Sequence, residues 1–397
     1  MNLSEKAMKV KESSTLAITA KAKALKEAGQ NVISFSIGEP DFGTPAHIVE
    51  AAMEALKSGF TKYTDSSGIP KLREAVCGKL KRENGLDYKP GQIVVSNGAK
   101  HAIANACAAL LNEGDEVIIP APYWLTYPEV VALNGGVPVV VQTDKANGYK
   151  ATAEQIAAAA TPKTKALLLN SPNNPTGSVY TEDELRAIAK VACEKDFFVI
   201  SDEIYEHLIY VPEIKHVSIA SFNPDIYNRT VVINGLSKSF AMTGWRMGYT
   251  ASNPEIAKVI ANIQSHQTSN INTITQMASI AAINGDHSCV WEMRTEFAKR
   301  RDYISERLKA IGFDMTVPAG AFYAFIDITD LCGKAKGITV KDASDFAAEL
   351  IAKKGVAIVP CADFGCPMHI RLSYALSMKE MAEGIDRIED FMKEYWG

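Results

Sequence analysis

The chain has 397 residues, of which 47% are hydrophobic and 22% are charged, and its formal net charge is −4. This length is enough for two domains with sizeable cores, and the slightly acidic balance gives no electrostatic reason to expect a nucleic acid or a membrane as a partner. No apolar stretch approaches the roughly 20 residues of a membrane-spanning helix, and the N-terminal segment lacks the apolar core of a secretory signal. We therefore expect a cytoplasmic protein.

The cysteines are odd in number and scattered, with no C-x-x-C pair. They are Cys77, Cys107, Cys193, Cys289, Cys332, Cys361 and Cys366. Structural disulfides are rare in large proteins that carry no export signal. We predict free thiols and no metal site.

Six short apolar runs, rich in β-branched residues, predict the strands of a sheet. They lie at 92–96, 116–120, 137–141, 165–170, 196–201 and 230–234. Most are continuous rather than alternating, which is typical of parallel strands covered on both faces. Helical patterns lie between several of them, and the helix at 181–196 begins with Thr181 and Glu184 at capping-box spacing. This alternation predicts a doubly wound, mostly parallel α/β domain.

The pattern changes near residue 285. A long, charged amphipathic helix is predicted at 287–312, and further helices at 340–355 and 377–396. Between them, alternating segments at 320–328, 355–360 and 369–375 predict strands. We predict a smaller α+β domain from residues 1–44 and 285–397, with an N-terminal helix at about 14–29, and a large domain from residues 45–284.

Polar residues follow several of the predicted strands, and ligands bind beyond the carboxyl ends of parallel strands. After 92–96, "SNGAK" opens a helix, so that the backbone near Gly98 and Ala99 forms either an anion site or an ordinary capped turn. After 165–170 comes the rigid loop "SPNNPTG", in which Asn174 is able to turn its amide toward a ligand oxygen. After 196–201, Asp202 is either a helix N-cap or a buried carboxylate that requires a partner.

The last of these strands is followed by "NGLSKSFAMTGWRMG", which contains Lys238. Burial lowers the pKa of a lysine readily, and the neutral amine is the nucleophile that forms a Schiff base. Ser237 and Arg246 supply hydrogen-bond donors suited to a phosphate group. An exposed lysine is the common alternative, but it would leave the polar residues after the other strands unexplained.

Together these groups fit pyridoxal 5′-phosphate. Lys238 would form the imine, and Asp202 would keep the pyridine nitrogen protonated, so that the ring accepts electrons. Asn174 and Tyr205 would donate hydrogen bonds to the phenolic oxygen. The phosphate would lie near Gly98, Ser237 and Arg246.

Several segments resemble the class I aminotransferases of fold type I. They are "SPNNPTG", "SDEIYEHLIY", "LSKSFAMTGWRMGY" and "HIRLSYA", together with "SIGEPDFGTPAHI" and "KYTDSSGIPKLREA". The likeness is greatest to the bacterial aspartate aminotransferases of subgroup Ib, and it extends from about Ser13 to Arg371. It implies the aspartate aminotransferase-like fold and a ping-pong transfer of the amino group from aspartate to 2-oxoglutarate through a Schiff base on Lys238.

The resemblance also implies roles for individual residues. Lys238 would move a proton between the substrate and the cofactor. Trp124 would stack on the pyridine ring, although a tryptophan in such a loop is more often a packing residue. Arg371 would bind the substrate α-carboxylate as a bidentate pair, with the backbone of Gly38 beside it. Tyr63 would reach the phosphate of a neighbouring subunit, which implies a homodimer with composite sites.

The predicted sites are therefore as follows. The catalytic residues are Lys238, Asp202 and Tyr205. The cofactor-binding residues are Gly98, Ala99, Lys100, Trp124, Asn174, Asp202, Tyr205, Ser237, Lys238, Arg246 and Tyr63. The substrate-binding residues are Gly38, Trp124, Asn174, Arg371, Lys100, Ser13 and Thr15.

Substrate choice depends on Lys100, which the resemblance places near the distal carboxylate of a dicarboxylic substrate. The alternative is a solvated lysine, although a cation is unfavourable in the first turn of a helix. Ser13 and Thr15 match small polar residues near the same end of the substrate. The same features occur in relatives that accept prephenate or aromatic substrates.

Other functions remain open on the same scaffold. A pyridoxal phosphate-dependent C–S lyase or a decarboxylase would use the same lysine, but Arg371 and Lys100 favour transamination. The effector domain of a transcriptional regulator would require an attached DNA-binding domain, and the aminotransferase-like pattern begins close to the start of this chain.

Overall fold

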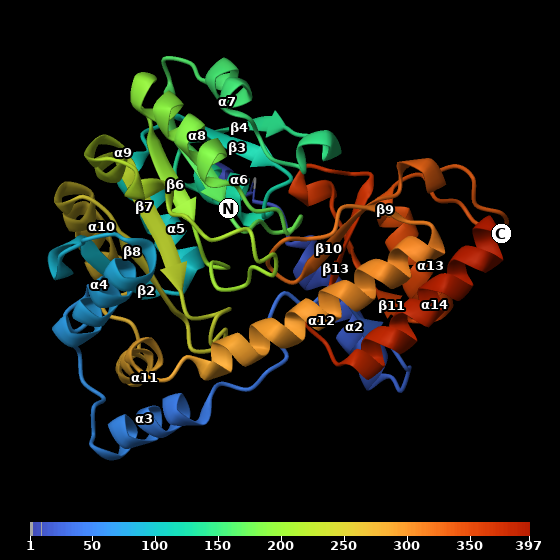
Figure 1. Cartoon of the computed structure of the whole chain (residues 1–397), viewed down its shortest axis with the longest axis horizontal. Coiled ribbons are helices and arrows are strands. Elements are labelled where there is room, and N and C mark those ends of the chain that lie inside the picture. Colours follow the sequence, from blue (N-terminus) through green and yellow to red (C-terminus); the bar gives the residue numbers. More distant parts are fainter. Residues whose placement is uncertain (1–2, 9) are drawn as a thin grey trace.

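The computed structural model describes residues 3–8 and 10–397. A seven-stranded sheet forms one part of the molecule, and a smaller sheet forms the other (Figure 1). The strands of the large sheet, in spatial order, are β2 (Ile93–Asn97), β8 (Met247–Ala251), β7 (Thr230–Gly235), β6 (Phe198–Asp202), β5 (Thr164–Asn170), β3 (Glu116–Ala121) and β4 (Val137–Gln142).

All neighbours in this sheet are parallel except β8, which is antiparallel to both β2 and β7. The mostly parallel sheet confirms the fold prediction, and the six predicted strands are present to within two residues. β8 is missing from the prediction because "MGYTA" is short, contains glycine and directly follows a loop motif.

The sheet is buried on both faces. Along β5, Leu168 packs into one apolar cluster, while Leu167 and Leu169 pack into another. Because side chains alternate across a strand, these clusters lie on opposite faces. The continuous apolar runs in the sequence reflect this arrangement. The nine helices of this part of the described chain are α3 (Ala46–Lys57), α4 (Pro70–Asn84), α5 (Ala99–Leu110), α6 (Thr126–Leu133), α7 (Ala153–Ala159), α8 (Glu182–Glu194), α9 (Pro224–Arg229), α10 (Pro254–Gln267) and α11 (Thr273–Asn284).

Local sequence explains where these helices begin. Thr181 is the N-cap of α8: its hydroxyl accepts a hydrogen bond from the N–H of Glu184, whose carboxylate accepts one from the N–H of Thr181. This confirms the predicted capping box. Gly98, with φ +83°, is the N-cap of α5, and its conformation turns β2 directly into the helix.

The smaller part is built around a four-stranded antiparallel sheet of spatial order β12 (Val359–Pro360), β13 (His369–Ser373), β10 (Tyr323–Asp327) and β9 (Asp314–Met315). β1 (Ile33–Ser34) pairs in parallel with β11 (Val356–Ala357), so a segment near the N-terminus joins the C-terminal elements. Its helices are α2 (Ser14–Glu27), α12 (Ser288–Ile311), α13 (Ala343–Lys354) and α14 (Met378–Trp396), whereas the short helix α1 (Glu5–Met8) contacts α6 of the large part.

The long helix α12 runs from beside α11 toward the C-terminal helices, and α2 lies among the elements of the smaller part (Figure 1). The division of the chain at residues 44/45 and 284/285 stays a prediction. Short 3₁₀ turns occur at Pro90–Gln92, Lys145–Asn147, Ile219–Ser221, Thr329–Leu331 and Ala362–Phe364. No helix within the described residues is both long and apolar enough to cross a membrane.

Candidate active site

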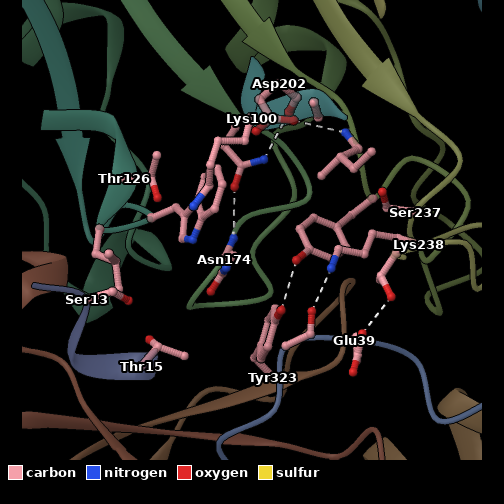
Figure 2. A pocket seen from close by; sticks show the side chains of 18 of the residues that line it. Ser13, Thr15, Glu39, Lys100, Thr126, Asn174, Asp202, Ser237, Lys238 and Tyr323 are labelled. Atoms are coloured by element: carbon pink, nitrogen blue, oxygen red, sulfur yellow. Dashed lines mark hydrogen bonds between the residues drawn. The ribbon is translucent and has the colours of Figure 1, made fainter. Parts of the chain in front are cut away.

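A cavity of about 460 Å³ opens where β2, β3, β5, β6 and β7 end. This is the edge at which open parallel sheets bind their ligands. Predicted site residues that line it are Ser13, Thr15, Gly38, Ala99, Lys100, Trp124, Asn174, Asp202, Tyr205, Ser237, Lys238, Arg246 and Arg371. In the view of Figure 2, Ser237 and Lys238 lie on one side of the pocket, and Ser13, Thr15 and Thr126 lie on the other.

Lys238 extends into this pocket from the loop after β7. Its Nζ donates a hydrogen bond of 2.6 Å to the carbonyl oxygen of Gly38 (Figure 2). Burial lowers the pKa of Lys238 to about 8, against the opposing charge of Glu39 and with help from Arg371. At pH 7 about a tenth of the amine is therefore neutral, far more than for an ordinary lysine, and the neutral amine is the form that a nucleophile or a general base requires.

Asp202 is the last residue of β6 and is only 2% exposed. Its Oδ2 accepts a 2.7 Å hydrogen bond from the hydroxyl of Tyr127, and its Oδ1 accepts one of 3.2 Å from the N–H of Ile204. Burial raises the pKa of Asp202 to about 6, while these donors oppose the shift. The carboxylate is thus buried and oriented, and it does not cap a helix.

The start of α5 and Arg246 form a site for an anion. The first N–H groups of a helix have no partner within it, and the helix dipole favours negative charge there. A Cβ added to Gly98 would lie 2.4 Å from Nη2 of Arg246, so only glycine allows the guanidinium to approach this closely. Arg246 itself has φ +56°, a strained conformation of the kind that functional sites often hold. Ser237, on the wall of the same cavity, is 7% exposed.

Arg371 reaches the cavity from β13 of the smaller sheet and is 2% exposed. Its Nη1 donates to Oδ1 of Asn174 at 2.9 Å, and its Nη2 donates to the carbonyl oxygen of Ser36 at 3.2 Å. Within residues 3–8 and 10–397, Nε of Arg371 and Oγ1 of Thr15 are buried without a hydrogen-bond partner. Unpaired buried polar atoms beside a cavity indicate that a polar ligand completes their hydrogen bonding.

Lys100 lies in the first turn of α5, with its Nζ 4.8 Å from the ring centroid of Trp124. Burial and the nearby charge of Arg246 lower its pKa. Both effects destabilise the charged form of Lys100, and the negative charge of a bound anion would stabilise it again. This geometry favours a ligand-binding lysine over a solvated one.

Two of the predicted site residues are not among those that line the cavity. Gly98 lies directly behind it, against Arg246. Tyr63 is 91% exposed on the surface of this chain. Its predicted contact with a second subunit therefore stays a prediction.

Sequence reasoning missed several residues of the pocket wall. They include Glu39, Thr126, Tyr127, Thr243 and Tyr323. The hydroxyls of Tyr205 and Tyr323 lie 2.9 Å apart (Figure 2). Of these residues, only Tyr127 could have been predicted from the sequence. It lies three residues after Trp124, a spacing that in a helical turn places both side chains on one face. Tyr323 comes from the smaller sheet, and nothing local in the sequence connects it to Tyr205.

A buried ionic cluster supports the segment that carries Asp202 and Tyr205. Lys79 of α4 pairs with Glu206, and Asn234 donates to the same carboxylate at 2.7 Å. Burial alone would raise the pKa of Glu206, but Lys79 and nearby histidines hold it well below its usual range. Glu203, Glu206 and His216 bring ligand atoms within 4.8 Å of one another. Because Lys79 already neutralises Glu206, we interpret this cluster as an ion-pair network.

Comparison with known proteins gives consistent matches over the whole chain. The profile of class I and II aminotransferases matches residues 30–388. An aspartate aminotransferase of Bacillus sp. (strain YM-2) is 48% identical over 382 residues, which cover 96% of each chain. A probable aspartate/prephenate aminotransferase of Aquifex aeolicus is 47% identical over 395 residues, which cover 99% of each chain.

The fold has a close counterpart among solved structures. The aspartate aminotransferase from Thermus thermophilus with maleate superposes with a TM-score of 0.93 at 41% identity. The match covers 98% of this chain and 99% of that one.

Proposed function

The chain belongs to the class I and II aminotransferases and is an aminotransferase enzyme. We propose that it transfers the amino group of L-aspartate to 2-oxoglutarate by a ping-pong mechanism, with pyridoxal 5′-phosphate as its cofactor. The observation that carries this proposal is the meeting of Lys238, Asp202 and Arg371 in one cavity at the edge of the large sheet. An amine, a buried carboxylate and a guanidinium are the groups that such a reaction requires.

The donor set of the pocket fits the cofactor. The N–H groups at the start of α5, the guanidinium of Arg246 and the hydroxyl of Ser237 suit a phosphate, and a side chain at position 98 would collide with that guanidinium. Asp202 supplies the carboxylate for a protonated ring nitrogen. When bound, pyridoxal phosphate supplies an aldehyde for amines and a ring that takes up the electron pair released at the substrate α-carbon.

Three further residues would orient the ring. Trp124 presents its indole to the cavity, and its edge is held by the ring of Tyr127 at a centroid distance of 5.5 Å. Oδ1 of Asn174 already accepts from Arg371, which leaves the amide N–H₂ to donate. The hydroxyl of Tyr205 is the second donor for the phenolic oxygen.

Lys238 carries the proton transfer in this proposal. Its lowered pKa makes the amine a base near neutral pH, and its Nζ would take the proton from the α-carbon of the substrate and pass it to the carbon of the cofactor's aldehyde group. The carbonyl oxygen of Gly38 fixes the amine when it is not bonded to the aldehyde group. The same residue serves both half-reactions, as a ping-pong exchange requires.

Arg371 and Lys100 would bind the two ends of a dicarboxylic substrate. Arg371 is buried and preorganised by Asn174 and Ser36, so little entropy is lost when it binds the α-carboxylate. Lys100, with Ser13 and Thr15 on the wall of the same cavity, is available for the distal carboxylate. The relatives named aspartate aminotransferase, and the maleate in the Thermus structure, support a dicarboxylic ligand.

Prephenate is a second candidate substrate. The Aquifex relative carries the name of an aspartate/prephenate enzyme at nearly the same identity as the aspartate enzymes. Prephenate is also a 2-oxo acid with a second carboxylate, so Arg371 and Lys100 would bind it by the same chemistry.

Assembly and location are part of the same proposal. We propose a homodimer in which Tyr63 of each chain reaches the phosphate site of the other; Tyr63 is 91% exposed in the single chain, so its side chain is accessible to a second subunit. We also propose that the chain divides into two domains at residues 44/45 and 284/285, and that the protein is cytoplasmic.

The test is an assay that measures oxaloacetate as it forms from L-aspartate and 2-oxoglutarate. The proposal requires turnover that depends on both substrates, is absent from cofactor-free protein and is restored by pyridoxal phosphate. Prephenate and phenylpyruvate in place of 2-oxoglutarate define the acceptor range. Turnover with aromatic acceptors but none with 2-oxoglutarate would contradict the proposed specificity.

A further inference from the structure

Tyr127 contacts the carboxylate of Asp202 from the first turn of α6. Its hydroxyl donates to Oδ2 of Asp202 at 2.7 Å, while the N–H of Ile204 donates to Oδ1 at 3.2 Å. Tyr127 and Asp202 are each only 2% exposed. Each oxygen of the buried carboxylate therefore has a protein donor.

The hydroxyl of Tyr127 opposes the effect of burial on Asp202. An ionised carboxylate only accepts hydrogen bonds, so a phenolic donor stabilises the charged form. Burial also raises the pKa of Tyr127 far above its usual value, which keeps the proton on its oxygen. The other charged groups that act on Asp202 are Glu203, which favours its protonation, and Lys238, which disfavours it.

The position of Tyr127 is fixed by the same turn that holds Trp124. The N–H of Tyr127 donates to the carbonyl oxygen of Trp124 at 2.9 Å, and the two rings meet edge to face. The side chain that would stack on the cofactor and the donor to Asp202 are therefore parts of one rigid unit. A shift of this turn would disturb both contacts.

We propose that Tyr127 is a positioning residue, whose hydroxyl keeps the Asp202 carboxylate ionised and directed toward the ring nitrogen of the cofactor. The proposal rests on the proposed function, because it assigns Asp202 to that nitrogen. Asp202 at the end of β6 would contact the ring nitrogen, and Tyr127 of α6 would hold its carboxylate in place. The effect of the Tyr127 hydroxyl passes through Asp202, whereas the ring of Tyr127 contacts Trp124.

The test uses enzyme loaded with pyridoxal phosphate labelled with ¹⁵N in the ring. The nitrogen chemical shift reports whether the ring nitrogen is protonated, and it is followed over a pH series in wild type and in Tyr127→Phe. Because the variant loses a hydrogen bond to a charged group, the midpoint for deprotonation should fall by about one to two pH units. The kcat should fall about tenfold or more, with the KM for aspartate little changed.

Tyr180→Phe is the matched control. Tyr180 is also a buried tyrosine of the large sheet region, but its hydroxyl accepts from the N–H of Ala151. A general effect of removing a buried phenol would appear in both variants. The proposal requires a shifted midpoint in Tyr127→Phe alone.

A second readout needs no cofactor. Infrared difference spectra of the protein without cofactor follow the protonation of Asp202, assigned by its loss in Asp202→Asn. The midpoint should rise in Tyr127→Phe and fall when Tyr127 is replaced by fluorotyrosine, a stronger donor of almost the same shape. Because fluorotyrosine keeps the hydroxyl and the shape of Tyr127, this protein tests the proposal even if Tyr127→Phe does not fold.

The outcomes separate the two proposals. Unchanged midpoints in Tyr127→Phe, or in the fluorotyrosine protein, would overturn the role of Tyr127 and leave the proposed function intact. Wild-type protein that takes up no pyridoxal phosphate would overturn the proposed function and with it the assignment to the ring nitrogen.

Discussion

The Nζ of Lys238 donates a 2.6 Å hydrogen bond to the carbonyl oxygen of Gly38. Lys238 follows β7 of the large sheet, whereas Gly38 follows β1, which pairs with β11 of the smaller part. The bond therefore joins the two parts of the molecule at the reactive amine.

The pKa of Lys238 predicts how cofactor-free protein reacts with pyridoxal phosphate. Burial lowers this pKa to about 8, so the fraction of neutral amine, and with it the rate of attachment, should rise through about pH 8 and then level off. An ordinary lysine, with a pKa of about 10.4, would give a rate that still rises near pH 10. Stopped-flow absorption over a pH series measures this rate.

Glu39→Gln supplies the control for this measurement. The negative charge of Glu39 raises the pKa of Lys238 against the effect of burial. Its removal should move the midpoint to lower pH. A midpoint that moves upward would mean that the charge of Glu39 does not act on the amine.

Lys100→Ser is expected to lower kcat/KM for L-aspartate by about 10- to 100-fold, because the distal carboxylate would lose a charged partner. The value for L-phenylalanine, which has no distal carboxylate, should change little. Lys100→Arg keeps the charge and should retain part of the preference for aspartate. Equal losses on both substrates would show that Lys100 only shapes the start of α5.

Tyr323→Phe separates the two contacts of Tyr323. The variant keeps the ring, whose centroid lies 4.4 Å from Cζ of Arg371, but it removes the hydroxyl 2.9 Å from that of Tyr205. We expect kcat to fall about 3- to 10-fold, as for the loss of one neutral hydrogen bond, with the KM for aspartate nearly unchanged. Steady-state kinetics decide it. A raised KM at constant kcat would mean that the hydroxyl of Tyr323 serves substrate binding and does not act through Tyr205.

The sequence predicted the parallel strands and most of the pocket because both depend on local patterns. Continuous apolar runs follow from burial on both faces, and Asp202 and Lys238 stand directly after such runs. Partners that come together only in the folded chain could not be predicted. Tyr323 belongs to the smaller sheet, and Lys79 meets Glu206 from a helix far away in sequence. Tyr127 could have been predicted from its three-residue spacing to Trp124.

Lys79→Met should destabilise the protein strongly. Lys79 is 7% exposed, and its removal takes away the nearest cation of the buried Glu206 carboxylate, which costs about 3–5 kcal/mol of unfolding free energy. Lys190→Met removes an exposed pair with Glu194 of α8 and should have no measurable effect. Urea unfolding followed by tryptophan fluorescence compares the two. Equal losses would mean that the buried cluster contributes no more than a surface pair.

The most direct test of the account is the absorption spectrum of purified protein with pyridoxal phosphate, before and after L-aspartate is added. We predict the absorption band of lysine-bound cofactor in wild type, its loss on adding L-aspartate and its return with 2-oxoglutarate. Lys238→Ala should lack this band and turn over neither substrate. The absence of the band from wild type, or wild-type turnover by Lys238→Ala, would contradict the assignment of Lys238.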